Sequence, residues 1–528
     1  MSAHPTIADT LEQTVDRHPN RDAIIYPRKD QRWSYAEFDE RVNRLATALL
    51  DAGIEKGDRV ATVLHNGSEM ALTVYACAKI GAVFTPLNFR LPAGEIEYIV
   101  NDAEADLLLF EAETQAAVEG ARSSLETVEE YVYIDDDVPA YASGFYNLLE
   151  SSPAERPDVA VTEDDAYAFI YTSGTTGRPK GVVHEHRSMV EHNLLCIAEM
   201  NVTRDDVGLS MMPLYHCAEL HCNLFPRVHR GAATVIHHEF EPEAALEAID
   251  EYDVSVLFAA PTAWNALSLS AAESDVDVSS LRLGLYGAAP MPEQVLDNCR
   301  EHLCEDYVQA YGMTEIGPAG VFQPPEDQVS KQGSAGLPAL NHEIRVVEPD
   351  ADPDRTVEGG EIGEILIAGP CTMREYWNRP EATERSLREA DGTTWYYTGD
   401  LGYRDDDGYL YVVDRKDDMI VSGGENIYPA EVEDALFSHE AVEEAAVVGE
   451  PDEEWGELVV AYVVADETVS ADELDSFVVE SDRLADFKRP RAYYFVDELP
   501  KNPSGKIQKF KLRDDEGDVD SEAETVAS

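Results

Sequence analysis

The sequence predicts an α/β protein with a large N-terminal domain of layered βα subdomains, a small β-barrel-like part and a small α+β C-terminal domain. Short apolar segments alternate with helix-like patterns through residues 22–90, which predicts a parallel or mixed sheet covered by helices. Alternating apolar and polar residues at 360–374 predict antiparallel strands. A run of apolar β residues ends at a charged segment, 414–417, so we expect the N-terminal domain to span 1–413.

Local patterns justify the first elements in turn. Residues 22–26 are mainly apolar and predict a short strand. Ser34 with Glu37 three residues later is the capping box of a helix start, and apolar residues recur at helical spacing through 38–49. The turn at 57–60 then leads into another strand, so strands and helices alternate from the start of the chain.

Later segments continue this pattern. Residues 166–171 and 254–258 are apolar and predict buried strands, and 283–287 is a further strand that leads into a turn of small residues. Beyond the charged segment, strands are expected at 444–448 and 459–464, with a helix before them and a helix and a strand after them. The acidic residues 513–528 are predicted to form a disordered tail.

The charge of the chain limits its partners. The 528 residues include 40 basic and 105 acidic side chains, and the net charge is −65. Nucleic acids and anionic membranes are polyanions, so neither is an expected partner. Such a chain repels itself in dilute buffer, and at about 1 M salt, where the Debye length is roughly 3 Å, this repulsion is screened. We therefore expect a protein from a halophile.

Cysteine content and hydropathy indicate a cytoplasmic location. The start of the chain lacks a charged segment followed by an apolar one, so no signal peptide is predicted. Apolar runs stay below the roughly 18 residues that predict a membrane span, so no membrane insertion is expected. The cysteines number seven, an odd count without regular spacing, which predicts reduced thiols. The oligomeric state is open, with a homodimer as one alternative.

One cysteine-rich segment raises the alternative of a metal site. His216 and Cys217 are followed by His221 and Cys222, which are metal-ligand residue types. The segment lacks a second ligand pair at zinc-finger spacing. We therefore favour a position in the core or in the lining of a pocket for these side chains.

The central motif is the loop at 171–181, YTSGTTGRPKG. It follows an apolar strand and combines hydroxyls with glycines and Lys180. Glycines let the backbone approach an anion, and backbone N–H groups and hydroxyls then bind phosphate oxygens. The spacing differs from a Walker A loop, which carries G-x-x-x-x-G-K-[ST] and opens a helix. The segment therefore predicts a phosphate-binding loop of a different kind.

This loop resembles the phosphate-binding signature of adenylate-forming enzymes, which include acyl-CoA synthetases, luciferases and peptide-synthetase adenylation domains. The family's other motifs follow in order at 283–290, 309–315, 395–400 and 499–509, and the resemblance covers roughly 20–512. It implies an N-terminal AMP-binding domain, a hinge at 414–417 with Asp417 as the hinge residue, and a mobile C-terminal domain, 418–512, that carries the catalytic lysine.

The resemblance also implies roles for individual residues. Lys506, Glu315 and Thr172 are the expected catalytic residues, and Thr172 and Glu315 are expected at Mg²⁺, which prefers oxygen ligands. The expected substrate pocket contains His216, Cys217, Tyr286 and Gly287. The expected contacts to ATP and coenzyme A are Ser173, Gly174, Thr175, Thr176, Gly177, Lys180, Gly287, Ala288, Ala289, Pro290, Gln309, Ala310, Tyr311, Gly312, Met313, Thr314, Asp400, Arg415, Gly423 and Gly424.

These residues predict an ATP-dependent acyl-CoA ligase that forms an acyl-AMP intermediate and then a thioester with coenzyme A. His216 stands where amino-acid-activating relatives usually carry an aspartate, which argues against an α-amino acid substrate. The small residues at 287–289 suit an apolar tail, so a medium-chain fatty acid is favoured. Short-chain or aromatic acids, or loading of a carrier protein, are the alternatives. A non-catalytic nucleotide sensor is disfavoured because Lys506, Glu315 and Asp400 are all present.

Overall fold

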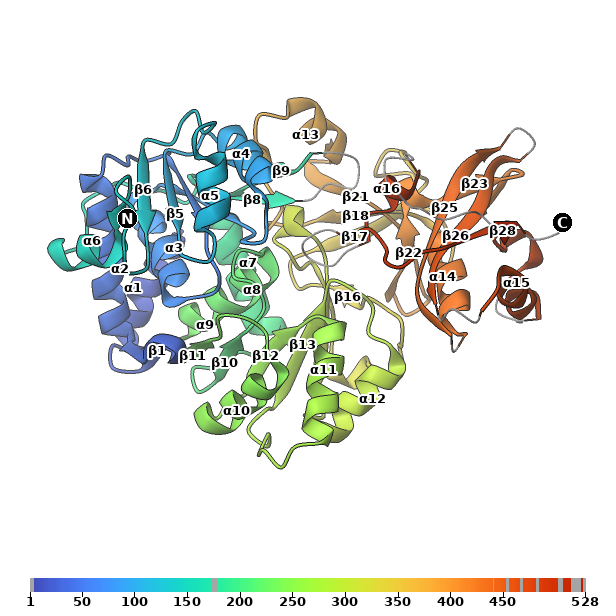
Figure 1. Cartoon of the computed structure of the whole chain (residues 1–528), viewed down its shortest axis with the longest axis horizontal. Helices are drawn as coiled ribbons and strands as arrows, with labels where there is room; N and C mark the ends of the chain where they lie inside the picture. The colour runs from blue at the N-terminus through green and yellow to red at the C-terminus, as the bar shows by residue number, and fades with distance from the viewer. Residues whose placement is uncertain are drawn as a thin grey trace. The chain divides into compact units, whose positions relative to one another are not determined.

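The computed structural model describes residues 4–172, 178–439, 441–452, 455–465, 469–480, 484–501, 507–513 and 524–525. The chain divides into two compact units (Figure 1). The larger unit comprises Met1–Thr172, Pro179–Ile344 and Ile367–Tyr396, and the smaller comprises Ser173–Arg178, Arg345–Leu366 and Tyr397–Ser528. The predicted fold class, a large N-terminal α/β domain followed by a small C-terminal domain, is confirmed.

One sheet of the larger unit carries the segments 283–290 and 309–315, which contain many of the expected contacts to ATP and coenzyme A. Its strands are β1 (Asp22–Tyr26), β2 (Gln31–Ser34), β10 (Val207–Ser210), β11 (Ala233–Ile236), β12 (Val256–Ala259), β13 (Leu283–Gly287), β14 (Tyr307–Tyr311), β15 (Val321–Gln323) and β16 (Leu337–Pro338). Their order is β16-β15-β14-β13-β12-β10-β11-β1-β2. The strands from β1 to β14 in this order are parallel, so the carboxyl ends of β13 and β14 lie side by side.

A second sheet of the larger unit carries the two strands that flank the central loop. Its strands are β3 (Arg59–Val63), β4 (Val83–Leu87), β5 (Leu107–Phe110), β6 (Glu130–Tyr133), β7 (Ser143–Gly144), β8 (Ala166–Thr172), β9 (Lys180–Glu185) and β19 (Glu375–Tyr376). Their order is β19-β9-β8-β4-β3-β5-β6-β7. The strands from β4 to β7 are parallel. The central strands β4 and β5 are buried along their whole length, as expected for a sheet covered on both faces.

Helices cover and connect these two sheets. They are α1 (Ile7–Arg17), α2 (Tyr35–Asp51), α3 (Ser68–Ile80), α4 (Ala93–Asp102), α5 (Gln115–Arg122), α6 (Phe145–Ser151), α7 (His186–Glu199), α8 (Cys217–Glu219), α9 (Phe225–Arg230), α10 (Pro242–Tyr252), α11 (Pro261–Ala272), α12 (Glu293–His302) and α13 (Pro380–Ser386). A π-helical turn, Leu220–Leu224, joins α8 to α9.

The main core of the larger unit lies between the sheets. It joins Ile24 of β1 and Phe84 of β4 to side chains of α1, α2, α3, α7 and α9. All residues of α3 are buried, so this helix is enclosed on every side. The predicted start of α2 is confirmed, because Ser34 and Glu37 form a capping box.

A third sheet follows in the chain. Its strands are β17 (Glu343–Val347), β18 (Gly363–Ala368), β20 (Leu387–Ala390), β21 (Thr393–Arg404) and β22 (Leu410–Arg415). The order is β17-β18-β21-β20, and β22 also pairs with β21. The predicted β-barrel-like part is wrong, because within the described residues these strands form an open sheet. The two halves of the long β21 pair with different strands, β20 and β22, instead of closing a ring.

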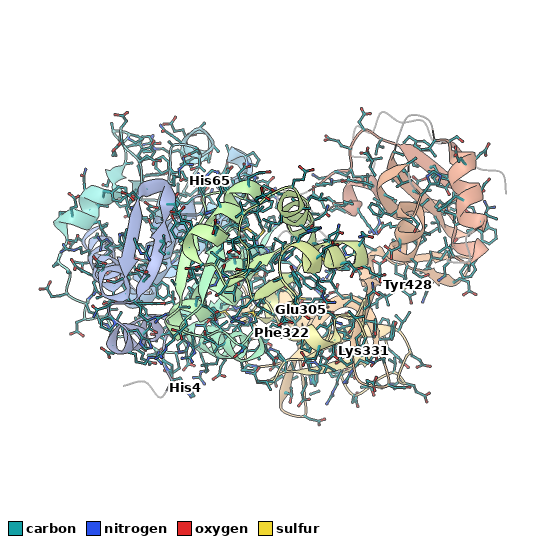
Figure 2. The ribbon with its side chains drawn as sticks, turned by 90° about the horizontal axis from the view of Figure 1, so that it is seen from below. His4, His65, Glu305, Phe322, Lys331 and Tyr428 are labelled. Carbon is teal, nitrogen blue, oxygen red and sulfur yellow. The ribbon has the colours of Figure 1, made fainter. Side chains whose placement is uncertain are left out.

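The rest of the smaller unit is the predicted C-terminal α+β part. It contains β23 (Ile420–Ser422), β24 (Glu425–Ile427), β25 (Val442–Asp452), β26 (Gly456–Ala465), β27 (Ala492–Phe495), β28 (Glu524–Thr525), α14 (Pro429–Phe437), α15 (Ala471–Glu480) and α16 (Lys509–Arg513). Tyr428, labelled in Figure 2, is the N-cap residue of α14, and Pro429 follows at the first helical position. The predicted strands at 444–448 and 459–464 lie within β25 and β26.

Two parts of the predicted disordered tail, 513–528, lie within the described residues: Arg513, and Glu524 with Thr525. Arg513 is the last residue of α16 and binds the segment at 417–418. Glu524 and Thr525 pair with β27. No helix among the described residues is both long and apolar enough to span a membrane.

Candidate active site

The central loop connects β8 and β9, which pair in antiparallel register. Thr172 lies opposite Lys180, and Tyr171 lies opposite Gly181. A Cβ atom on Gly181 would lie 3.0 Å from the Tyr171 ring, so glycine permits this close approach. The predicted phosphate contacts Ser173, Gly174, Thr175, Thr176 and Gly177 lie outside the described residues. The structure therefore shows both ends of the loop, each with a polar side chain.

Glu315 is held at the centre of a small buried group. It lies in the 3₁₀ turn Thr314–Ile316, and 8 % of its surface is exposed. The Tyr376 hydroxyl donates a 2.7 Å hydrogen bond to Glu315 Oε1, and the Met373 N–H donates a 2.7 Å bond to the Glu315 carbonyl oxygen. The Glu315 carboxylate is thus positioned by a segment that is distant in sequence.

Lys180 completes this group, which we call the Glu315–Tyr376–Lys180 cluster. Its ammonium nitrogen lies 4.4 Å from the centroid of the Tyr376 ring. Burial lowers the pKa of Lys180, and the negative charge of Glu315 acts in the opposite direction. Burial raises the pKa of the Tyr376 phenol, so this hydroxyl remains a donor. A carboxylate, a cation and a hydroxyl donor therefore meet at one place.

Tyr376 was not among the predicted site residues. It lies on β19, which pairs with β9 and places Tyr376 opposite Val182. This pairing, and not a local motif, brings Tyr376 to the strand that carries Lys180. No pattern in the sequence around Tyr376 distinguishes it from the chain's other tyrosines, so only the three-dimensional structure identifies it.

The predicted substrate-pocket residues His216 and Cys217 are placed differently from each other. His216 is the N-cap of α8, and its Nδ1 accepts a 3.2 Å hydrogen bond from the Ala218 N–H. Solvent reaches the His216 ring, although desolvation by the surrounding protein lowers its pKa. Cys217 is buried, and its sulfur lies 3.1 Å from the Thr314 hydroxyl. Burial raises the pKa of Cys217 to about 12, so the thiol is neutral.

The ends of β13 and β14 bring together two more predicted segments. Gly287 lies opposite Ala310, and a Cβ atom on Gly287 would lie 2.6 Å from the Ala310 carbonyl oxygen. Tyr286 is buried and donates a 2.6 Å hydrogen bond to the Gln328 side chain. The predicted contacts Ala288, Ala289 and Pro290 follow β13 and are exposed, and Gln309, Ala310, Tyr311, Gly312 and Met313 are half-buried. The exposed small residues Ala288 and Ala289 leave room for a bound molecule at the end of β13.

The smaller unit brings together Asp400 and Arg415. They lie opposite each other on β21 and β22, and Arg415 Nη1 donates a 2.5 Å hydrogen bond to Asp400 Oδ1. The Asp400 N–H in turn donates to the Thr398 hydroxyl over 3.0 Å. The sequence predicted both residues separately, and the strand register shows that they form one pair.

The predicted coenzyme A segment is the tight turn between β23 and β24. Gly423 and Gly424 have φ angles of 61° and 86°, which favour glycine. The Gly423 N–H donates a 2.8 Å hydrogen bond to the Trp455 carbonyl oxygen, and a Cβ atom on Gly423 would lie 3.0 Å from the indole ring. Trp455 is 51 % exposed and was not predicted as a site residue.

The predicted hinge residue, Asp417, is exposed within the 3₁₀ turn Lys416–Asp418. Arg513 Nη1 donates a 3.1 Å hydrogen bond to the Asp417 carbonyl oxygen, and Arg513 Nη2 donates a 2.8 Å bond to Asp418. This arginine therefore links α16 to the turn. The predicted catalytic residue Lys506 lies outside the described residues.

Two side chains of the larger unit, Glu315 and Thr172, offer oxygen ligands of the kind that Mg²⁺ prefers. Glu315 supplies a carboxylate and Thr172 a half-buried hydroxyl, and Mg²⁺ takes few protein carboxylates and completes its shell with water and phosphate. These groups fit an enzyme that binds Mg²⁺ and a nucleotide, in a chain whose predicted phosphate-binding loop lacks the Walker A sequence.

The chain belongs to the AMP-binding enzyme family, whose profile matches residues 11–377, and the family's C-terminal domain matches residues 431–506. It is 39 % identical over 485 residues to feruloyl-CoA synthase of an Amycolatopsis species, covering 91 % of this chain and 93 % of that protein. It is 36 % identical over 508 residues to a long-chain-fatty-acid–CoA ligase of Mycobacterium tuberculosis, with coverages of 96 % and 97 %.

A similar solved structure is O-succinylbenzoate coenzyme A synthetase from Bacillus subtilis in complex with ATP and magnesium ion. Its TM-score is 0.83 and its sequence identity 34 %, with 95 % of this chain and 98 % of that chain covered. The predicted class, AMP-forming acyl-CoA synthetase, and the predicted use of ATP, Mg²⁺ and coenzyme A are confirmed for the family to which this chain belongs.

Replacing Tyr376 by phenylalanine tests whether its hydroxyl positions Glu315. We expect acyl-AMP formation to slow by about 10- to 100-fold, because a hydrogen bond to a charged group contributes about 1.5–3 kcal/mol. The measurement is pyrophosphate release over a Mg²⁺ titration. Tyr397→Phe is the matched control, because the Tyr397 hydroxyl donates to the Ala351 carbonyl oxygen instead. Equal rates for the two variants would contradict this role for Tyr376.

Proposed function

We propose that this chain is an ATP-dependent acyl-CoA ligase with the following two half-reactions. A carboxylate oxygen of the acid attacks the α-phosphorus of ATP, and the bond to pyrophosphate breaks, giving acyl-AMP. The thiol of coenzyme A then gives its proton to solvent, its sulfur bonds to the acyl carbon, and the bond from that carbon to the phosphate oxygen breaks, so that AMP leaves. The observation that carries the proposal is the Glu315–Tyr376–Lys180 cluster in a member of this family, with Lys180 at the start of the strand that follows the predicted phosphate-binding loop.

The cluster addresses the main difficulty of the first half-reaction, in which an anion attacks a polyanion. Lys180 is proposed to supply a positive charge, and the hydroxyl of Thr314, which contacts the Cys217 sulfur, is proposed as a hydrogen-bond donor to the phosphate. Glu315 and Thr172 are proposed to hold Mg²⁺, which when bound neutralises charge on the phosphates. Fixed charges and donors aimed at developing negative charge stabilise the transition state. Lys506 is proposed as a further donor, on the basis of its sequence motif.

Residues of the smaller unit are proposed to bind the remaining parts of the substrates. Asp400 and Arg415 are proposed to contact the ribose, and Gly423 with Gly424 the pantetheine arm of coenzyme A. The boundary after residue 413, the hinge at 414–417 and the C-terminal domain at 418–512 are part of this proposal. Rotation about Asp417 would separate the two half-reactions, as in the family that the sequence resembles.

The acid is proposed to be a medium-chain fatty acid. The small residues Gly287, Ala288 and Ala289 support an apolar tail, and His216 disfavours an ammonium group. An aromatic acid is the second candidate. The aromatic candidate is supported by two similar proteins that are named for aromatic acids, a feruloyl-CoA synthase and an O-succinylbenzoate coenzyme A synthetase.

A panel of acids tests the reaction and the acid together. The enzyme is given ATP, Mg²⁺ and one acid at a time: a fatty acid from a series of increasing chain length, benzoate or a cinnamate. Each acid is tested without a thiol, with coenzyme A and with a carrier-bound thiol. The nucleotide products are separated by chromatography. We expect AMP and pyrophosphate, and full turnover only with coenzyme A and a medium-chain acid. Formation of ADP would overturn the reaction, whereas a preference for cinnamates would favour the aromatic candidate.

Asp400→Ala is expected to raise the KM for ATP by about 10- to 100-fold, the range for hydrogen bonds worth about 1.5–3 kcal/mol to a charged group. The proposed cause is loss of the ribose contact and of the carboxylate that orients Arg415. Initial rates over an ATP titration measure it. Asp406→Ala on the exposed turn between β21 and β22 is the control. An unchanged KM in Asp400→Ala would remove Asp400 from the site.

We also propose that the chain works in the cytoplasm of a halophile, on the basis of its net charge of −65. The melting temperature is expected to rise markedly between about 0.1 and 3 M KCl, because screening of repulsion among acidic side chains outweighs the weakening of surface ion pairs. Calorimetric scans at several KCl concentrations measure this rise. A flat or falling series would contradict the proposed origin.

A further inference from the structure

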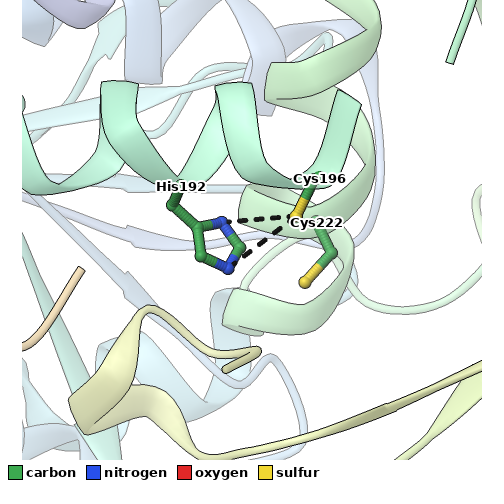
Figure 3. A group of neighbouring side chains, drawn as sticks. All are labelled: His192, Cys196 and Cys222. Atoms are coloured by element: carbon green, nitrogen blue, oxygen red, sulfur yellow. Dashed lines mark hydrogen bonds between the residues drawn. The ribbon is translucent and has the colours of Figure 1, made fainter. Parts of the chain in front are cut away.

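Two helical segments of the larger unit place three metal-ligand side chains together. His192 and Cys196 are four residues apart on α7 and therefore lie on one face of that helix. Cys222 comes from the π-helical turn, a type of irregularity that is frequent at functional sites. Figure 3 shows the His192 ring and both sulfur atoms grouped beneath α7. Their ligand atoms all lie within 4.8 Å of one another.

The distances within this group suit a single ion. The Cys196 sulfur lies 3.6 Å from His192 Nδ1 and 3.8 Å from Nε2. Ligands at about 2.3 Å for sulfur and about 2.0 Å for nitrogen around a tetrahedral ion are themselves roughly 3.5 Å apart. His192 and Cys196 are fully buried and Cys222 is 8 % exposed. The group is thus compact and shielded from solvent.

We propose that His192, Cys196 and Cys222 form a binding site for a thiophilic divalent cation of the Zn²⁺ type. One imidazole and two sulfurs without a carboxylate form a ligand set that favours Zn²⁺ over Mg²⁺. Two thiolates and one divalent cation sum to zero charge, which permits burial. Zinc sites with three protein ligands keep a fourth position for water.

The site is connected to the turn that carries Thr314 and Glu315. The Ala319 N–H donates a 3.3 Å hydrogen bond to His192 Nε2. A cation bound at Nε2 would take that lone pair, and one bound at Nδ1 would leave the proton of the neutral ring on Nε2. In both cases Ala319 loses its acceptor. Cation binding therefore disturbs the segment that follows Glu315, and this coupling rests on the proposed function.

Cobalt titration tests the site without any assay of activity. The full chain is titrated with Co²⁺ in high KCl and a phosphine reductant, which keeps the thiols reduced. We expect a near-ultraviolet sulfur-to-cobalt charge-transfer band that saturates at one ion per chain and disappears when Zn²⁺ is added. Carboxylates of the acidic surface produce no such band, so adventitious binding is distinguished. Absence of the band would show that the three residues only fill the core.

Substitution of single cysteines shows which sulfur atoms give rise to the cobalt charge-transfer band. Cys222→Ala and Cys196→Ala are expected to lose at least one sulfur contribution, whereas Cys304→Ala, which removes a buried thiol from another core cluster, is expected to keep the full band. Circular dichroism shows whether each variant is folded. If a variant does not fold, the titration of the wild type alone decides whether the chain has a sulfur-ligated cation site. An unchanged band in Cys222→Ala would overturn the site.

The coupling is tested separately by acyl-AMP formation at saturating Mg²⁺. One equivalent of Zn²⁺ is expected to slow the wild type by about 2- to 10-fold, the range for one neutral hydrogen bond. Cys222→Ala is expected to escape this inhibition. Equal inhibition of both would place the effect at another site. If no acid gives acyl-AMP, the proposed ligase function is contradicted. The proposed cation site is not, because the cobalt band does not depend on catalytic activity.

Discussion

Replacing Glu315 by glutamine is expected to slow acyl-AMP formation by about 10²- to 10³-fold, while the protein stays folded. Glutamine keeps the size of the side chain and an oxygen that accepts from Tyr376, so packing is preserved. It removes the negative charge that is proposed to hold Mg²⁺ and that faces Lys180. The magnitude is the usual loss for one group that stabilises charge in a transition state.

Single-turnover formation of acyl-AMP measures the effect of this substitution, and a Mg²⁺ titration separates weak metal binding from slow chemistry. Glu381→Gln on the exposed start of α13 is the matched control, because it changes the net charge equally at a site away from the cluster. If Glu315→Gln reacts as fast as Glu381→Gln at every Mg²⁺ concentration, Glu315 is not a metal ligand.

Lys506→Ala and Asp417→Pro are expected to impair opposite half-reactions. Lys506→Ala should slow acyl-AMP formation by about 10²- to 10³-fold and leave thioester formation from synthetic acyl-AMP near the wild-type rate. Asp417→Pro should form acyl-AMP but transfer it slowly to coenzyme A, because proline fixes φ near −65° in a hinge that has to rotate. Both half-reactions are measured on both variants.

Two controls make this comparison specific. Asp417→Ala removes the same carboxylate but leaves the backbone free, so it is expected to behave like the wild type. Arg513→Ala removes the guanidinium that bonds the Asp417 carbonyl oxygen and the Asp418 carboxylate, and so tests that contact separately. Equal loss of both half-reactions in Lys506→Ala would show that Lys506 is a general binding residue and that the two conformations are not separated here.

Short motifs predicted the parts of the candidate site that are local in sequence. Thr314 and Glu315 come three and four residues after the end of β14, and Gly287 ends β13, so strand patterns and small residues were sufficient to find them. Asp400 and Arg415 were found singly, because their pairing depends on the register of β21 and β22. The site residues that sequence could identify are those whose surroundings come from their own neighbours in the chain.

Contacts between distant segments explain what the sequence did not reveal. Tyr376 reaches Glu315 only because β19 pairs with β9. Alternating residues at 360–374 indicated β strands, and one strand, β18, lies within this range. Alternation carries no information on whether the edges of a sheet meet, and the barrel prediction failed for that reason. The grouping of Cys222 with α7 likewise depends on packing between helices that are separate in the chain.

The enclosed helix α3 has a consequence for synthesis of the chain. Tyr75 on α3 packs edge-on against Phe225 with ring centroids 5.5 Å apart, and both belong to the core between the two sheets. This partner is made about 150 residues later, which at about 5–20 residues per second takes roughly 8–30 s. During that interval the apolar surface of α3 lacks its final cover, so the nascent chain requires protection from aggregation until α9 has left the ribosome.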